Sequence, residues 1–105
     1  MLQFLKKLFT PAEPTDFKSL VDQGATIIDV RTPAEFKGGH IKKSKNIPLQ
    51  SLSAKMDSLN KHNTYILCCA SGGRSGSARR MMSSAGFENV HNGGGWMQLQ
   101  NALNR

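Results

Sequence analysis

The chain has 105 residues, which is enough for one domain and too few for a second hydrophobic core. Hydrophobic residues make up 38% of it, a composition typical of a globular protein and not of a disordered one. The net charge is +7, from 14 basic and 7 acidic residues. The two cysteines, Cys68 and Cys69, are adjacent, which excludes a disulfide framework between distant segments and favours a reducing compartment, so we expect a cytoplasmic protein.

We interpret residues 1–14 as an N-terminal arm and residues 15–105 as the folded domain. The first nine residues are apolar but are interrupted by Lys6 and Lys7, so they lack the unbroken apolar run of a signal peptide. A short amphipathic arm that packs on the domain is our expectation, with contact to a membrane surface as the alternative. No stretch approaches the about 20 apolar residues that cross a bilayer, so we expect no membrane span.

Helical and strand patterns alternate along the rest of the chain. Apolar residues recur at helical spacing after capping residues, whereas short β-branched runs mark strands. The clearest helix start is Thr32-Pro33-Ala34-Glu35, a capping box with proline at the first helical position. In chain order we expect a helix after Thr15 or Asp16, a strand at 25–30, a short helix after Thr32, a strand at 44–47, a helix from Ser51 or Ser53, a strand at 64–68, a helix from Ser75, a strand at 87–91, a turn at 93–95, and a final helix with Trp96, Leu99 and Leu103 on one face.

This alternation predicts an α/β fold with a small, doubly wound, mostly parallel sheet and helices on both of its faces. In such folds the ligand site lies beyond the carboxyl ends of the strands. Cys69 falls at that edge, between the end of a strand and the start of a helix. The topology therefore draws attention to the segment that begins at this cysteine.

The segment from Cys69 to Ser75 carries the strongest chemical signal. A loop of small residues points successive N–H groups inward, and the helix that follows adds the positive end of its dipole. Arg74 adds a permanent positive charge, and together these features lower the pKa of the Cys69 thiol. A thiolate in such a cradle attacks electrophilic sulfur or phosphorus, so Cys69 is the candidate nucleophile. The candidate substrate-binding residues beside it are Ala70, Ser71, Gly72, Gly73, Arg74 and Ser75.

Two other interpretations stay open. Counted from Cys68, five residues separate a cysteine from Arg74, which is the spacing of cysteine phosphatases, where arginine clamps two phosphate oxygens. Successive side chains of a strand face opposite sides, so only one of the two cysteines faces the loop. We expect Cys68 to be the buried strand-end residue, with a resolving thiol as the alternative. A non-catalytic binding module is the third function class.

The chain resembles the single-domain rhodaneses, a family of sulfurtransferases. The resemblance covers roughly residues 15–103 and rests on several blocks in combination. These blocks are Ile28-Asp29-Val30-Arg31-Thr32-Pro33-Ala34-Glu35-Phe36, Gly39-His40-Ile41 continuing to Asn46-Ile47-Pro48, Ile66-Leu67-Cys68-Cys69 through Arg74-Ser75, and Gly93-Gly94-Gly95-Trp96.

The resemblance implies a five-stranded rhodanese-like sheet, with Cys69 at the catalytic position and a six-residue loop over Cys69–Arg74. It also implies that Cys69 accepts a sulfane sulfur from a donor such as thiosulfate or a persulfide, and passes it to cyanide or a thiol. No cofactor is implied, and no metal-ligand spacing is present in the sequence. A small anionic sulfur donor and a thiol or protein persulfide are the expected partners.

Four residues outside the loop have two interpretations each. Asp29 either holds the cysteine loop or joins neighbouring loops, and we favour the joining role. Arg31 either meets an anionic substrate or is structural, and we keep it among the candidate substrate-binding residues. Glu35 either pairs with Arg74 or only closes the capping box, which is enough to explain it. His40 is expected to be a hydrogen-bonded structural residue instead of a base.

The positive charge does not predict a nucleic-acid partner. Lysines and arginines are scattered, and no aromatic residues interleave with them as stacking platforms. The one cluster is Lys42, Lys43 and Lys45. We expect attraction of anionic substrates or of an acidic partner, and a monomer.

Overall fold

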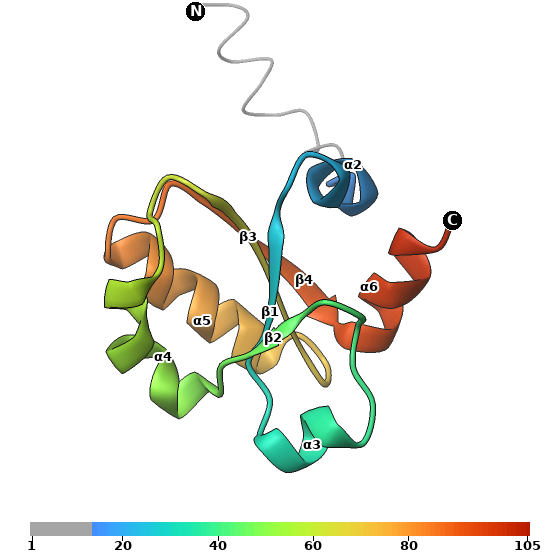
Figure 1. Cartoon of the computed structure of the whole chain (residues 1–105), viewed down its shortest axis with the longest axis horizontal. Coiled ribbons are helices and arrows are strands. Elements are labelled where there is room, and N and C mark those ends of the chain that lie inside the picture. Colours follow the sequence, from blue (N-terminus) through green and yellow to red (C-terminus); the bar gives the residue numbers. More distant parts are fainter. Residues whose placement is uncertain (1–13) are drawn as a thin grey trace, which may run out of the picture.

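A computed structural model of the protein describes residues 14–105, so the predicted N-terminal arm lies almost wholly outside the described residues. Strands and helices alternate along the described chain, as the sequence predicts (Figure 1). In order, the elements are α2 (Phe17–Asp22), β1 (Thr26–Asp29), α3 (Pro33–Lys37), β2 (Lys45–Asn46), α4 (Leu49–Lys55), the 3-10 helix η1 (Met56–Ser58), β3 (Thr64–Cys69), α5 (Gly73–Ser84), β4 (Asn89–Gly95) and α6 (Trp96–Leu103).

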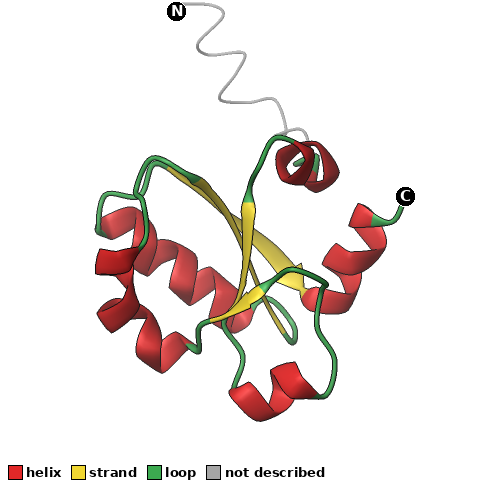
Figure 2. Ribbon diagram, in the orientation of Figure 1, coloured by secondary structure: helices red, strands yellow, loops and turns green. Residues whose placement is uncertain are grey.

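The strands form one parallel sheet in the order β2-β1-β3-β4 (Figure 2). The predicted α/β class with a parallel sheet is therefore confirmed. The prediction of a fifth strand is wrong, because residues 14–105 form four strands. These four are the ones that the hydrophobic pattern marks, and no further β-branched run was available between residues 14 and 105 to add another.

Helices cover both faces of the sheet, as predicted (Figure 1). On one face, Leu52 of α4 and Met82 of α5 pack in a core with Ile28 and Leu67. On the other face, Leu99 of α6 packs with Ile27 and Ile66, next to α2. The alternation of side chains along each strand explains the two cores, because neighbouring residues of a buried strand face opposite layers.

The helix starts follow their capping chemistry. The Asp16 side chain accepts a hydrogen bond from the Ser19 amide at 3.0 Å and caps α2. Thr32 and Glu35 form the predicted capping box at the start of α3. Two predicted starts are wrong by a few residues: α4 begins at Leu49, directly after Pro48, and α5 begins two residues before Ser75.

The glycine run that was predicted as a turn is the end of a strand. β4 continues through Gly95, and its pairing with β3 shifts register between Leu67 and Cys68, which leaves Gly93 as the extra residue. A Cβ atom on Gly93 would lie 2.9 Å from side-chain atoms of Ile66 and of Leu99. Glycine is required here because the bulge brings the backbone against the core, not because the chain reverses.

Candidate functional site

The two cysteines lie on opposite faces of the last two positions of β3. Cys68 is fully buried in the apolar cluster that contains Ile27, Ile66 and Leu99. This burial, with the nearby Asp29 carboxylate, raises the pKa of the Cys68 thiol to about 12. The prediction of a buried strand-end cysteine is confirmed, and its burial and raised pKa do not favour Cys68 as a nucleophile.

Cys69 faces the loop that follows β3. Its Sγ accepts a hydrogen bond from the Gly72 amide at 2.9 Å and a longer one from the Ser75 amide at 3.4 Å. The Ser75 hydroxyl lies 3.3 Å from the same sulfur. Burial alone would raise the pKa of the Cys69 thiol, but hydrogen bonds from Ser75 and from the Ser71 and Gly72 amides outweigh it and lower the pKa below the ordinary thiol value.

Gly72 gives the loop its curl. Its backbone has a φ of 104°, a left-handed conformation that glycine adopts readily, and it forms the N-cap of α5. The helix starts at Gly73, so the free N–H groups of its first turn lie close to the sulfur. Ser75, where the sequence predicted the helix to begin, lies in the first turn of the helix with its hydroxyl turned toward Cys69.

Asn92 of β4 is a member of the site that the sequence did not point to. Its Oδ1 atom lies 2.7 Å from the Ser75 hydroxyl and accepts the Gly94 amide at 2.9 Å. Its Nδ2 atom donates to the Gly72 carbonyl at 3.3 Å. An asparagine before a glycine run gives no signal of this contact, because the contact depends on how β4 pairs with β3.

Arg74 turns toward α3. It donates to Glu35 through both terminal nitrogens, at 2.6 and 2.9 Å, in a partly exposed two-pronged ion pair. These hydrogen bonds, with one from the Thr32 backbone, lower the pKa of the Glu35 carboxyl to about 2. Both interpretations of Glu35 hold, since it closes the capping box and also pairs with Arg74. The cradle around Cys69 is therefore built from N–H groups and a hydroxyl, with the charge of Arg74 already balanced.

Arg31 is part of the scaffold beneath the site. It is 4% exposed and forms a buried two-pronged ion pair with Asp29, with contacts of 2.6 to 3.0 Å. Its terminal nitrogens also donate to the carbonyls of Glu35 and Gly39, and its guanidinium lies over the Trp96 ring. These contacts support the structural role for both Asp29 and Arg31, so substrate binding by Arg31 stays a prediction that the geometry does not favour.

His40 is structural, as expected. Its Nδ1 atom lies 2.7 Å from the Phe36 carbonyl, and its ring stacks on the Phe36 ring at 3.7 Å between centroids. This contact fixes the turn that leads from α3 toward β2. His40 therefore contributes to the fold, and neither of these contacts with Phe36 reaches the cysteine loop.

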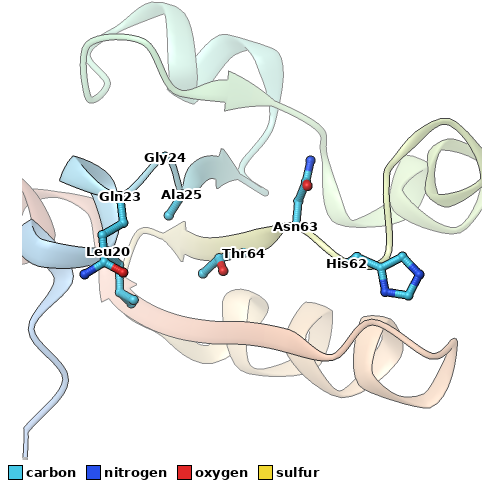
Figure 3. A pocket seen from close by; sticks show the side chains of 7 residues that line it. All are labelled: Leu20, Gln23, Gly24, Ala25, His62, Asn63 and Thr64. Carbon is cyan, nitrogen blue, oxygen red and sulfur yellow. The ribbon is translucent and has the colours of Figure 1, made fainter.

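Two hollows bracket the sheet. One, of about 460 Å³, lies beside the cysteine loop and is lined by Ala70, Ser71, Gly95, Trp96, Met97 and Gln98. The other, of about 280 Å³, is shown in Figure 3 and is lined by Leu20, Gln23, Gly24, Ala25, His62, Asn63 and Thr64. The second lies at the strand starts, the opposite end from Cys69, and no residue of the cysteine loop lines it. Of these two hollows, the one beside the cysteine loop is better placed to receive a ligand of Cys69.

Comparison with known proteins identifies the domain. The model of the rhodanese-like domain matches residues 13–102. The chain belongs to the rhodanese-like domain family. Thiosulfate sulfurtransferase GlpE of Pseudomonas fluorescens is 32% identical over 91 residues, which cover 87% of this chain and 84% of that protein. The structure of a rhodanese with anions from Escherichia coli superposes with a TM-score of 0.68 at 30% identity, covering 71% of this chain and 91% of that one.

Other relatives are longer. The protein YqhL of Bacillus subtilis is 37% identical over 68 residues, which cover 65% of this chain and 54% of that protein. The chain thus spans about half the length of that curated relative, and 51% of slr1261 of Synechocystis. Within residues 14–105 no helix is long and apolar enough to cross a membrane.

Proposed function

We propose that this rhodanese-like domain is a sulfurtransferase that carries a sulfane sulfur on Cys69. The observation that carries the proposal is the convergence of the Gly72 and Ser75 amides on the Cys69 sulfur, at the carboxyl end of the central strand. These groups lower the pKa of the thiol below its ordinary value, so they favour the nucleophilic thiolate. The same groups hold the negative charge of a persulfide as well as that of a thiolate.

With thiosulfate as donor, the reaction has two displacements. In the first, the Cys69 thiolate attacks the outer sulfur of thiosulfate, a new S–S bond forms, and sulfite leaves with the electron pair of the bond that breaks. In the second, cyanide or a thiolate attacks the outer sulfur of the Cys69 persulfide, and the Cys69 thiolate leaves. Cyanide gives thiocyanate, the charges balance in both steps, and no external oxidant or reductant takes part.

The dimensions and charge of the cradle favour sulfur over phosphate. Cys69 is 1% exposed beneath a loop of small residues, so only a narrow group reaches it. A phosphoryl dianion needs the arginine clamp, and Arg74 is engaged by Glu35. A single sulfur atom needs only the N–H groups that already point at Cys69. This difference supports sulfur transfer over phosphate hydrolysis.

The relatives support the same reaction class. GlpE is named a thiosulfate sulfurtransferase, and a further relative, YrkF of Bacillus subtilis, is named a putative sulfur carrier protein. We propose thiosulfate or a protein persulfide as donor, with a thiol as an alternative acceptor to cyanide. The hollow beside Ser71 and Trp96 lies where such a donor would approach the loop.

Steady-state assays test the proposal. The protein and its Cys69→Ser and Cys68→Ser variants are supplied with thiosulfate and cyanide, and thiocyanate is measured; an aryl phosphate is offered in parallel. We expect turnover in the wild type and in Cys68→Ser, and none in Cys69→Ser. Turnover that depends on Cys68, or hydrolysis of the aryl phosphate without sulfur transfer, would contradict the proposal. Folded protein with no turnover of thiosulfate or a glutathione persulfide would favour a binding module.

A further inference from the structure

The hydroxyl of Ser75 has one hydrogen and three neighbours that compete for it. These are Cys69 Sγ at 3.3 Å, the Gly72 carbonyl at 3.2 Å and Asn92 Oδ1 at 2.7 Å. Ser75 itself is fully buried, so water does not relieve the competition. Which neighbour receives the hydrogen decides whether the hydroxyl donates to the cysteine sulfur or accepts from it.

The Gly72 carbonyl is the weakest competitor. It already accepts the Gly76 amide at 3.0 Å, as the first hydrogen bond of α5, and Asn92 Nδ2 at 3.3 Å. Two donors fill the two lone pairs of a carbonyl oxygen. The hydrogen of Ser75 is therefore shared between Cys69 and Asn92, and the shorter contact is the one to Asn92.

The orientation of Asn92 is fixed by its other contacts. The Gly94 amide donates to Oδ1 at 2.9 Å, and Nδ2 faces the Gly72 carbonyl. An amide turned the other way would set Nδ2 against the Gly94 N–H, and Oδ1 against a carbonyl. The atom that faces Ser75 is therefore an acceptor, and it cannot lend the hydroxyl a hydrogen.

We propose that Asn92 is a positioning residue of the site, which holds the Ser75 hydroxyl hydrogen and so competes with the Cys69 thiolate for it. With the hydrogen on Asn92, the hydroxyl oxygen accepts the S–H of a neutral Cys69 thiol. When Cys69 loses its proton, the hydroxyl turns and donates to the thiolate, and Asn92 Oδ1 keeps only the Gly94 N–H. The hydrogen bonds that join Cys69, Ser75 and Asn92 thus set the balance between a neutral Cys69 thiol and a reactive thiolate, through rotation of one hydroxyl.

The position of Asn92 makes the inference testable. Asn92 is exposed, so its replacement removes no core packing, unlike that of Ser75. Removing the competing oxygen with Asn92→Ala leaves the hydroxyl free to serve the thiolate. We expect the pKa of Cys69 to fall by about 0.5 to 1 unit, because one hydrogen bond of ordinary strength no longer has to break.

The measurement is the rate of alkylation by iodoacetamide as a function of pH, with tandem mass spectrometry to assign the alkyl group to Cys69. The set is wild type, Asn92→Ala, Ser75→Ala and the double variant. The proposal expects the fall in pKa on the wild-type background and no change on the Ser75→Ala background, since Asn92 acts through Ser75. A rise in pKa, or an equal change on both backgrounds, would overturn it.

Asn92→Asp gives an independent arm. A carboxylate only accepts, so it holds the Ser75 hydrogen more strongly, and the pKa of Cys69 rises. Part of that rise comes from the added charge, and only the part that acts through Ser75 disappears in Ser75→Ala. An undiminished rise on that background would contradict the proposal. The inference relies on the proposed function only in treating Cys69 as the reactive thiol, and alkylation reports it even if no sulfur is transferred.

Discussion

Arg74 and Glu35 join the first turn of α5 to the capping box of α3, through two hydrogen bonds of 2.6 and 2.9 Å between residues 39 positions apart. The sequence suggested Arg74 as an open anion contact for the substrate. In the structure the Arg74 guanidinium is instead paired with the carboxylate of Glu35. We therefore expect the pair to limit the positive charge that the cysteine loop offers to the proposed anionic donor.

Replacement of Glu35 by Gln should strengthen binding of thiosulfate. Glutamine preserves the capping box, since it accepts at the same position, but it leaves the charge of Arg74 unbalanced. We expect the KM for thiosulfate to fall by about two- to fivefold with little change in kcat, the effect of one partly exposed charge. Glu88→Gln removes the same charge near His62, at the other end of the sheet, and is the matched control. An equal change in both variants would contradict the assignment.

The Glu35–Arg74 pair should stabilise the fold over a defined pH range. In the folded protein the pKa of the Glu35 carboxyl is about 2, below its ordinary value of 4.5. The carboxyl therefore contributes stability above pH 4.5 and loses that contribution as the pH falls toward 2. We expect the stability difference between wild type and Glu35→Gln to be constant above about pH 5 and to shrink below it. Urea unfolding of both proteins across this range measures it, and a difference that grows toward acid pH would contradict the pairing.

Gly72 and Gly73 should respond differently to alanine. Gly72 has a φ of 104°, whereas a Cβ on Gly73 would meet nothing within 4 Å. Gly72→Ala should cost about 1–2 kcal/mol of stability and raise the pKa of Cys69, because the loop amide at 2.9 Å from Sγ shifts. Gly73→Ala should be nearly neutral. Thermal unfolding and alkylation by iodoacetamide measure both effects, and equal losses in the two variants would show that the loop conformation does not depend on Gly72.

Removing one partner of the buried ion pair of Asp29 and Arg31 should destabilise the fold strongly. Arg31→Met leaves the Asp29 carboxylate buried without its partner, and we expect a loss of about 3–5 kcal/mol. The double variant with Asp29→Asn should recover part of this loss, since no charge is then left unpaired. Urea unfolding of the three proteins measures the coupling. A double variant as unstable as the sum of the two single changes would mean that the residues act independently.

The parts of the site that the sequence predicted are local. The strand, the small-residue loop and the following helix are consecutive, so the residues from Cys69 to Ser75 already imply a cradle of N–H groups. Alternation of side chains along a strand likewise implied that only one cysteine faces the loop, and the expected end of the strand at Cys68 favoured Cys69. The capping box of Thr32 and Glu35 follows from a spacing of three residues.

The parts that the sequence did not determine depend on contacts between distant segments. Asn92 reaches Ser75 only because β4 lies beside β3 in a particular register, with Gly93 as a bulge. The pairing of Arg74 with Glu35 was one of two open interpretations, because the capping box alone explained Glu35. Judged from the sequence alone, a run of glycines predicts a turn. In the structure the run belongs to a strand, and Gly93 is needed because its backbone packs against Ile66 and Leu99.

Single-turnover mass spectrometry tests the central claim most directly. The protein is mixed with thiosulfate in the absence of an acceptor, and its intact mass and the location of any added sulfur are determined before and after cyanide is added. We predict one added sulfur on Cys69, present in Cys68→Ser, absent in Cys69→Ser, and removed by cyanide. An adduct that persists in Cys69→Ser but disappears in Cys68→Ser would contradict the account.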